Sequence, residues 1–456
     1  MWTRREFLTT TSAAVLAAAL QAREEDLWST AADILRRITD PVFPARDVDL
    51  TAHGAKGDGT TDCTASIRAA IDACHAGGGG RVVVPAGRFL TGAIRLKSNV
   101  NLHLLEGATI AFRPEADAYL PLVLTRFEST ELMNYSPFIY ALDETNVGIT
   151  GRGTLDGQAN AQQWWNWRTG QAPARNKLVQ MATDGVPPEQ RVFGDGPSKL
   201  RVNFIQPYRC TNVIIEGVRI VNSPMWELNP VLCTNVTVRG LNISSHGPNN
   251  DGCDPESCRD VLIERCTFDT GDDCIALKSG RNEDGRRLHT PIENVVIRDC
   301  DMKDGHGGVT IGSEISGGAR NIFAEKCRMD SPRLDRALRF KNNAARGGLI
   351  ERVAMRDVTV GQLAEAVVAA DFFYEEGRNG KFTPILRDVD VRNVTSRKSK
   401  YAFMLRGFAE APIANIRVTD CTFDGVESPD VLEGVKDLVL KNVRVNGQPR
   451  NETISR

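Results

Sequence analysis

The segment Asn294-Val295-Val296-Ile297-Arg298-Asp299-Cys300 contains the pattern from which the fold can be predicted, because variants of it recur along most of the chain. The second residue of every copy is Val, Ile or Leu, and the seventh is Val, Leu or Cys. Copies begin about 22 to 36 residues apart, a period typical of solenoids built from stacked supersecondary units. The copies begin at Asn212, Asn235, Asp260, Asn294, Asn321, Arg352, Asp388, Asn415 and Asp437.

The residue types within each copy indicate strands rather than helices. Alternating β-branched residues are bounded by Gly, Asp and Asn, which favour the bends between short strands. Since the repeat covers most of the 456 residues and no Ser/Pro-rich linker interrupts it, we expect one elongated all-β domain over residues 23–456. The repeat therefore predicts a single-stranded parallel β-helix.

An N-terminal cap is predicted over residues 45–80. Thr60, Thr61 and Asp62 offer helix N-cap chemistry before an amphipathic stretch, Ser66 to Cys74, and the glycines at 77–80 favour its end. A helix here would cover the first coil, whose exposed strand edge would otherwise invite aggregation.

The extreme N-terminus resembles an export signal over residues 1–22. Thr3-Arg4-Arg5-Glu6-Phe7-Leu8 precedes an apolar run to Leu20, as in bacterial twin-arginine signals. The run is shorter than the roughly 20 residues of a stable spanning helix, so no stable membrane insertion is expected. We predict an exported, periplasmic or secreted protein, cleaved after Ala19 or Ala22; the alternative is a basic start to an ordinary buried helix.

Composition argues against nucleic acid as a partner. The chain has 56 Lys and Arg against 58 Asp and Glu, a net charge of −2, whereas nucleic-acid binding normally shows as a basic excess or stripe. It gives no indication of oligomeric state.

We predict that most of the cysteines are core residues. Four of the 11, Cys266, Cys300, Cys327 and Cys421, occupy the seventh position of their copies, so we expect them to stack as small buried hydrophobes. Metal ligation is disfavoured because no Cys-x-x-Cys pair or suitably spaced histidine accompanies them. Cys253 and Cys258, five residues apart, leave a disulfide open.

Four polar signatures interrupt the repeat: Asn249-Asn250-Asp251, Gly271-Asp272-Asp273-Cys274, Gly305-His306-Gly307 and Arg339-Phe340-Lys341. A bend at Gly271 would let Asp272 and Asp273 face one groove, where close carboxylates separate each other's pKa values. Asp272 and His306 each lie twelve residues after the start of consecutive copies, which places them on neighbouring coils about 4.8 Å apart.

Arg339 and Lys341 are two residues apart and share one strand face, which suits an anionic group on a substrate. Any one of the acids or the histidine could instead be a hydrogen-bonded corner residue. Their co-occurrence on adjacent coils favours a functional site.

The chain resembles glycoside hydrolase family 28, the polygalacturonase family, over nearly all of its predicted mature length. The resemblance includes the four signatures and the segments 53–62, 85–92 and 151–157, and the chain looks most like bacterial exo-acting members. Asn250 departs from the threonine of the family pattern, while the acid that follows is in place. The resemblance implies a right-handed β-helix and a pectin-degrading enzyme that cleaves α-1,4-galacturonosidic bonds.

Carried onto this sequence, the resemblance implies that Asp272 is the general acid and that Asp251 and Asp273 hold and deprotonate the attacking water. His306 would tune the acids, and Arg339 and Lys341 would hold the uronate carboxylate. An inverting hydrolysis of this kind has carboxyl groups roughly 6.5 to 9.5 Å apart and requires neither metal nor cofactor. The partner would be a pectic polysaccharide or oligogalacturonide.

A long segment, Tyr135 to Cys210, is expected to insert between coils and to close one end of the cleft, which would favour exo-cleavage. Its tryptophans, Trp164, Trp165 and Trp167, could line the cleft or only pack the loop against the β-helix. A decorated pectin such as rhamnogalacturonan, a calcium-dependent β-helical lyase and a non-catalytic glycan-binding β-helix remain as alternative functions.

Overall fold

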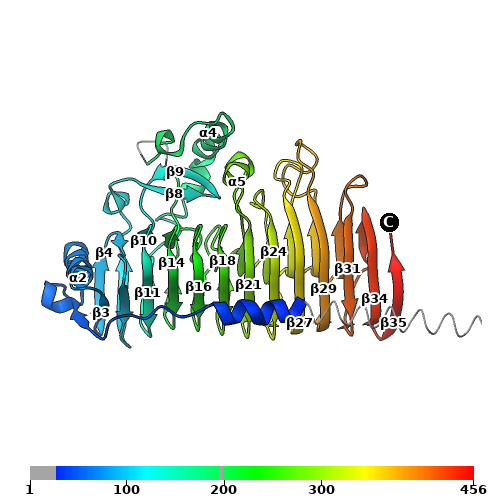
Figure 1. The fold of residues 1–456 in the computed structure, drawn as a ribbon, viewed down its shortest axis with the longest axis horizontal. Helices are drawn as coiled ribbons and strands as arrows, with labels where there is room; N and C mark the ends of the chain where they lie inside the picture. Colours follow the sequence, from blue (N-terminus) through cyan, green and yellow to red (C-terminus); the bar gives the residue numbers. More distant parts are fainter. Residues whose placement is uncertain (1–26, 195–198) are drawn as a thin grey trace, which may run out of the picture.

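The computed structural model describes residues 27–194 and 199–456, which form a long right-handed parallel β-helix (Figure 1). The predicted fold class is confirmed. The predicted export signal of residues 1–22 lies outside the described residues. No helix within residues 27–194 and 199–456 is both long and apolar enough to cross a bilayer.

Each coil contributes strands to three parallel rows, and the rows run along the length of the molecule. The first row contains β1 (Asp47–Asp49), β3 (Gly80–Val84), β6 (Val100–Leu104), β11 (Thr145–Gly151), β14 (Thr211–Glu216), β16 (Thr234–Arg239), β18 (Arg259–Glu264), β21 (Ile292–Arg298), β24 (Ala319–Glu325), β27 (Leu349–Gln362), β29 (Ile385–Lys398), β31 (Ile413–Thr419) and β34 (Val435–Val445).

The second row contains β2 (Asp58–Asp62), β4 (Gly87–Thr91), β7 (Ala108–Phe112), β12 (Thr154–Asp156), β15 (Arg219–Val221), β17 (Asn242–Ser245), β19 (Thr267–Thr270), β22 (Asp301–Met302), β25 (Arg328–Met329), the later parts of β27, β29 and β34, and β32 (Thr422–Phe423). The third row contains β5 (Ile94–Arg95), β10 (Ile139–Leu142), β13 (Ile205–Tyr208), β20 (Ile275–Leu277), β23 (Val309–Ile311), β26 (Arg336–Lys341), β28 (Ala366–Asp371), β30 (Tyr401–Arg406) and β33 (Val431–Glu433).

The first residue of each repeat copy forms a corner of the coil. Asn212, Asn235 and Asn294 have φ between 58° and 59°, the left-handed conformation that Asn and Asp adopt more readily than other non-glycine residues. Their amides also bond between coils: the side chain of Asn235 donates to Asn212 Oδ1 at 2.8 Å, and that of Asn212 donates to Asn146 Oδ1 at 2.9 Å. The recurrence of Asn and Asp at this position thus has a conformational and a hydrogen-bonding cause.

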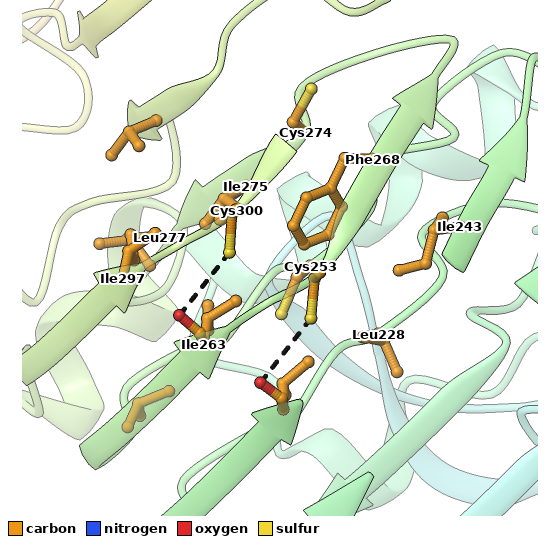
Figure 2. Packing of buried hydrophobic residues seen from close by; sticks show 14 of the residues in the cluster. Leu228, Ile243, Cys253, Ile263, Phe268, Cys274, Ile275, Leu277, Ile297 and Cys300 are labelled. Atoms are coloured by element: carbon orange, nitrogen blue, oxygen red, sulfur yellow. Dashed lines mark hydrogen bonds between the residues drawn. The ribbon is translucent and has the colours of Figure 1, made fainter. Parts of the chain in front are cut away.

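The interior is a continuous apolar column in which the predicted cysteines are buried. Cys300 lies beside Ile263, whose carbonyl accepts from its thiol at 3.8 Å (Figure 2). All 11 cysteines are free and buried, so the disulfide left open for Cys253 and Cys258 is absent. Cys258 belongs instead to a second stack, where its sulfur accepts from the amide of Cys233 at 3.3 Å.

The predicted cap helix is α2 (Thr64–Ala76), and it covers the first coil at one end of the rod (Figure 1). Its buried face contains Ile67, Ile71 and Cys74. The expected N-cap residues are displaced by one: Cys63 is the N-cap, while Asp62 Oδ1 accepts from the amide of Thr64 at 2.9 Å. At the opposite end, β35 (Gln448–Ile454) pairs antiparallel with β34 and covers much of its edge.

A second N-terminal helix, which the sequence did not lead us to expect, spans residues 27–37 and lies along the outside of the first row (Figure 1, blue). Its apolar side packs on outward-facing residues of four consecutive coils: Leu262, Val296, Phe323 and Ala354. Arg37 pairs with Asp260 at 2.9 Å, and Arg356 lies 3.7 Å from the centre of the Trp28 ring. This helix braces the central coils.

Two excursions rise from the N-terminal half of the rod, on the side opposite that brace (Figure 1). The first is the hairpin of β8 (Val123–Phe127) and β9 (Thr130–Asn134). The second lies between β12 and β13 and contains α3 (Trp167–Gly170), α4 (Ala172–Thr183) and the 3-10 turn η3 (Pro188–Gln190). The insertion is therefore shorter than the expected range of Tyr135 to Cys210, because residues 139–156 form an ordinary coil.

The remaining short elements are the 3-10 turns η1 (Leu50–His53) and η2 (Ala116–Tyr119) and the helix α5 (Asn282–Leu288). Buried ion pairs attach the hairpin and the insertion to the β-helix. Arg126 Nη1 lies 2.5 Å from Glu256 Oε1, and Arg191 Nη1 lies 2.7 Å from Asp284 Oδ2. Breaking either pair would leave a buried charge uncompensated, so both excursions are firmly placed.

Candidate active site

The predicted site residues converge where the second row turns into the third. Asp251 follows β17, Asp272 and Asp273 follow β19, and His306 follows β22, while Arg339 and Lys341 lie on β26. One oxygen each of the three aspartates lies within 4.8 Å of the other two. The stacking of coils therefore brings together residues separated by up to 90 positions in the sequence.

Asp273 is the buried centre of this group. Its Oδ2 lies 2.7 Å from Lys341 Nζ, and its Oδ1 accepts from Thr310 Oγ1 at 2.9 Å and from Arg339 Nη1 at 3.1 Å. Burial opposes ionisation, but the charges of Lys341 and Arg339 outweigh it and lower the pKa of Asp273. Asp273 is thus held as a carboxylate.

Gly307 leaves the space that Asp273 needs. A Cβ at this position would lie 2.3 Å from Thr310 Oγ1 and 2.9 Å from Asp273 Oδ1. Any larger residue would displace the hydroxyl or the carboxylate. This contact explains one of the two glycines that flank His306.

Asp272 faces the cavity beside His306, as the arithmetic of the repeat predicts. His306 Nδ1 lies 2.9 Å from Asp272 Oδ1, and the His306 amide donates to the carbonyl of Asp272 at 3.1 Å. The bond to Asp272 raises the pKa of His306. The side chain of Asp272 is 19% exposed and that of His306 is 51% exposed, so both are open to a substrate.

Asp251 reaches the cavity from the coil before Asp272. Burial raises the pKa of Asp251, and the charges of Asp254 and Asp272 raise it further. Lys278 Nζ, 3.8 Å from Asp251 Oδ2, acts in the opposite direction. The environments of Asp251 and Asp273 therefore shift their pKa values in opposite directions.

Asn250, which departs from the family pattern, shapes the loop that presents Asp251. Its Oδ1 accepts from Ser245 Oγ and from the amide of Gly247, both at 2.7 Å. Its side-chain nitrogen donates to the carbonyls of Ser223 and Met225 at 3.1 and 2.9 Å. Asn250 is fully buried and satisfied, so its role is to hold the loop.

Asp251 and Asp272 line a cavity of about 480 Å³ that is walled at one end by the two excursions, while Asp273 lies buried behind these two acids. Glu128 comes from the turn of the β8–β9 hairpin, Arg168 from α3, and Ala172 and Arg175 from α4. Arg175 Nε lies 2.5 Å from Glu128 Oε2, which joins the two parts of the wall. The expected closure of one end of the cleft is therefore present, with the hairpin as an additional part.

The three tryptophans do not line this cavity. Trp164 is buried against Tyr119 and Phe138, with ring centres 5.3 and 5.4 Å apart. Trp165 Nε1 donates to the carbonyl of Ser223 at 2.8 Å, and Trp167 packs at a tilt against Trp164, with ring centres 4.6 Å apart. Of the two alternatives, the packing role is correct.

The separation of the acids differs from what we expected. Carboxyl groups roughly 6.5 to 9.5 Å apart were anticipated, whereas the nearest oxygens of all three lie within 4.8 Å. The cause is that Asp272 and Asp273 are consecutive and Asp251 lies on the adjacent coil. With three acids in one site, their spacing does not assign the stereochemistry of the reaction.

The same proximity raises the question of a metal ion. Both oxygens of Asp273 are already engaged by Lys341, Arg339 and Thr310, and Lys278 faces Asp251. A cation would have to compete with these positive charges, so the residues present do not fit a metal centre.

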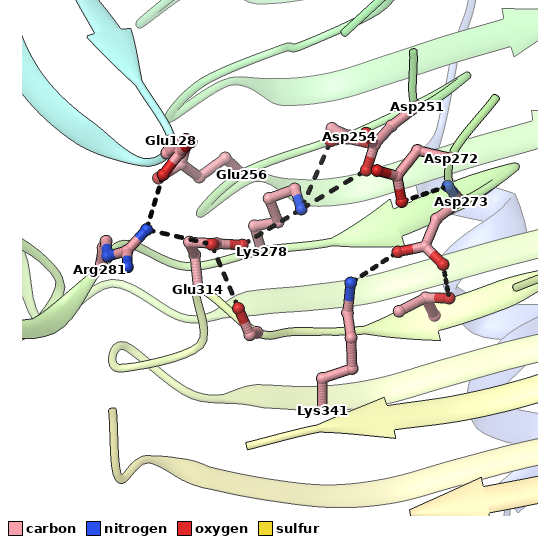
Figure 3. Close-up of polar contacts among 12 residues, drawn as sticks. Glu128, Asp251, Asp254, Glu256, Asp272, Asp273, Lys278, Arg281, Glu314 and Lys341 are labelled. Carbon is pink, nitrogen blue, oxygen red and sulfur yellow. Dashed lines mark hydrogen bonds and ion pairs between the residues drawn. The ribbon is translucent and has the colours of Figure 1, made fainter. Parts of the chain in front are cut away.

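Several groups around the site were missed in the sequence: the buried Trp226, Asp254, Lys278 and Glu314, and the half-buried Glu128. Lys278 could have been identified by aligning the coils, because Lys278, Gly312 and Lys341 occupy the same position on three successive coils of the third row. Its Nζ lies 3.2 Å from Glu314 Oε2 and 3.5 Å from Asp254 Oδ2 (Figure 3). These residues form a second charged layer beneath Asp251.

Comparison with known proteins identifies the class. Residues 194–443 match the profile of glycosyl hydrolases family 28. The chain belongs to this family and is a glycoside hydrolase.

Three relatives show that the similarity extends to individual polygalacturonases. The crystal structure of a hyperthermoactive exopolygalacturonase from Thermotoga maritima is similar, with 44% identity and a TM-score of 0.91 over 94% of this chain and 98% of that one. An exo-poly-alpha-D-galacturonosidase from Dickeya chrysanthemi is 28% identical over 77% of this chain and 62% of its own length. A probable polygalacturonase from Vitis vinifera is 27% identical over 83% and 74%.

Proposed function

We propose that the chain is an exo-acting polygalacturonase that hydrolyses α-1,4-galacturonosidic bonds at chain ends and releases galacturonate. The observation that carries this proposal is the acid cluster at the foot of a cavity walled by the hairpin and α3–α4. A wall beside the acids limits how far the chain can extend past the cleaved bond. The similarity to the exopolygalacturonase of Thermotoga maritima also supports exo-acting hydrolysis.

In this proposal Asp272 protonates the glycosidic oxygen, because it faces the cavity. Asp251 and Asp273 hold the water and take its proton. Asp273 is suited to orienting water rather than attacking carbon, since each of its oxygens already accepts hydrogen bonds. We therefore retain an inverting mechanism, in which water enters opposite the leaving group.

His306 tunes Asp272 through the bond from its Nδ1. Arg339 and Lys341 keep donors to spare after pairing with Asp273, because a guanidinium has five N–H groups and an ammonium three. Those donors can bind the uronate carboxylate of the substrate, so the two cations would serve Asp273 and the substrate together.

Two measurements test the proposal. Polygalacturonate digested in the presence of chelator should yield saturated galacturonate monomer from the first time points, without unsaturated products. Unsaturated products would indicate a lyase, turnover restricted to rhamnogalacturonan would indicate a decorated-pectin hydrolase, and binding without turnover would indicate a glycan-binding protein. Proton NMR of the first product should show the β-anomer, because inversion of an α-linkage gives β.

Export also belongs to this proposal. The pectic substrate is a polymer outside the cell, and the twin-arginine pattern of residues 3–8 would direct the folded enzyme to it. Fractionation of cells that express the intact chain and an Arg4→Lys, Arg5→Lys variant should place only the intact chain in the periplasm or medium.

A further inference from the structure

The charged layer beneath Asp251 contains more acids than cations. Lys278 Nζ lies 3.2 Å from Glu314, 3.5 Å from Asp254 and 3.8 Å from Asp251, and it sits 4.4 Å from the centre of the Trp226 ring. Its side chain is 3% exposed. One buried ammonium thus faces three carboxyl groups, and it cannot balance all of them as carboxylates.

Glu314 has further support for its charge. Arg281 Nη1 lies 3.8 Å from its Oε1, and Ser313 Oγ donates to the same oxygen at 3.2 Å. Burial opposes ionisation, yet the charges of Lys278 and Arg281 outweigh it and lower the pKa of Glu314. Figure 3 shows Glu314 between the two cations.

Asp254 has less support, because its ion pair with Lys278 at 3.5 Å is not accompanied by any hydrogen bond to its carboxylate from the described residues. It is fully buried, it does not line the cavity, and neither oxygen accepts a hydrogen bond from any residue in 27–194 or 199–456. The register places Ala276 above Asp254 in the next coil, and a methyl group offers no donor. A buried carboxylate that accepts no hydrogen bond is costly, whereas the protonated form lowers that cost. Burial raises the pKa of Asp254 to about 8, although Lys278 lowers it.

We propose that Asp254 is protonated and so adds no negative charge beside Asp251, and that Lys278 is a positioning residue that then holds Asp251, whose own burial opposes ionisation, in place as a carboxylate. This inference rests on the proposed function only for the role of Asp251 as a base. Asp251 lines the cavity whereas Asp254 does not, so Asp251 is the one of these two acids that can contact a water molecule there.

The charged groups that face this layer come from several coils. The charges that act most strongly on Asp251 and Lys278 are those of Asp254, Asp272, Asp273 and Glu314, besides the two groups themselves. The charge of Lys341 lowers the pKa of Asp254, and the charge of Arg281 lowers the pKa of Glu314. Lys278 is the cation within 4 Å of Asp251 among the described residues, so its removal changes the balance at Asp251 directly.

The pH profile of kcat separates a positioning role from a structural one. In Lys278→Met, Asp251 loses its counter-charge, so its pKa should rise. The acid limb of the kcat profile should then move up by about one pH unit, and kcat should fall by about 10²-fold. Lys278→Arg, which keeps the charge, should restore the limb. An unchanged profile with only a higher KM would overturn the proposal, because Lys278 would then bind substrate.

Asp254→Asn replaces a protonated acid by an uncharged group of similar shape. We expect its acid limb to stay where wild type has it. A limb shifted down would contradict the proposal, because it would mean that an ionised Asp254 had been competing with Asp251 for Lys278. If wild type itself fails to hydrolyse polygalacturonate, the proposed function fails, and the state of Asp254 is decided by the following measurement.

Thermal unfolding between pH 4 and 8 tests Asp254 without any substrate. In the unfolded chain Asp254 ionises near pH 4, while the folded protein keeps the proton to about pH 8. Folding thus takes up a proton in this window, and this group makes stability fall as pH rises through it. The loss of Tm from pH 4 to 8 should be smaller in Asp254→Asn than in wild type. Equal losses would show that Asp254 is not protonated.

Discussion

Lys341 Nζ lies 2.7 Å from Asp273 Oδ2, and both side chains are buried. This contact ties the cation proposed to receive the uronate to the acid proposed to hold the water. Asp273 is 0% exposed, so the pair is shielded from solvent and each partner depends on the other for its charge.

Replacing Lys341 by Met should therefore impair the chemical step as well as substrate binding. Arg339 would remain as the cation in direct contact with Asp273 among the described residues, and we expect kcat to fall by about 10²-fold or more. Steady-state kinetics on trigalacturonate measure this effect. Lys400→Met, an exposed lysine before β30, is the matched control and should retain wild-type kcat. A Lys341→Met enzyme with normal kcat would show that the contact with Asp273 is not needed.

The wall of the cavity can be tested by filling it. Ala172 is exposed at the start of α4 and lines the cavity, so Ala172→Trp should occlude the position of the terminal sugar and raise KM by about tenfold or more. Asn176→Trp, which adds the same ring to an exposed position on α4 away from the cavity lining, should leave KM unchanged. Equal effects of the two substitutions would mean that the wall does not contact substrate.

The brace formed by residues 27–37 should contribute to stability but not to catalysis. Ile34 is 0% exposed against the outward apolar residues of the central coils. Ile34→Ala should cost about 2 to 5 kcal/mol in the free energy of unfolding, measured by urea denaturation, with kcat unchanged. Arg36→Ala, an exposed position on the same helix, should cost about 1 kcal/mol or less. A cost that small at Ile34 would show that the brace is dispensable.

The 11 buried thiols give a chemical test of the core. The native protein should react slowly with Ellman's reagent, and all 11 thiols should react after unfolding without a reductant. Fewer reactive thiols in the unfolded protein would reveal a disulfide. Fast reaction of the native protein would show that the thiol stacks are accessible.

Much of the fold was predictable because two positions of each repeat have strict physical demands. The first requires a left-handed corner, which favours residues such as Asn294 and Asp260, and the second points into the core. The proximity of Asp272 and His306 followed from the same counting. A regular solenoid converts sequence spacing into distance, so residues that keep the period can be placed without coordinates.

Features outside the period were harder to predict. The brace was missed, although the third residue of four consecutive copies is apolar where an exposed face would normally be polar, as at Leu262 and Phe323. Lys278 lies beyond the motif that contains Asp272. Its role depends on contacts with Asp251 on the preceding coil and Glu314 on the following coil, which the motif does not contain. The excursions fold on their own small core, which includes Phe127 and Leu178, so no repeat position predicted their path over the cavity.

Acid-assisted exo-cleavage can be tested by the time course of products from polygalacturonate with wild type and Asp272→Asn, in chelator. We predict saturated galacturonate monomer as the first and main product of wild type, and a loss of activity of about 10³-fold or more in the variant, whose amide cannot donate the proton at the leaving oxygen. Mixed internal oligomers at early times, or an Asp272→Asn enzyme as active as wild type, would contradict it.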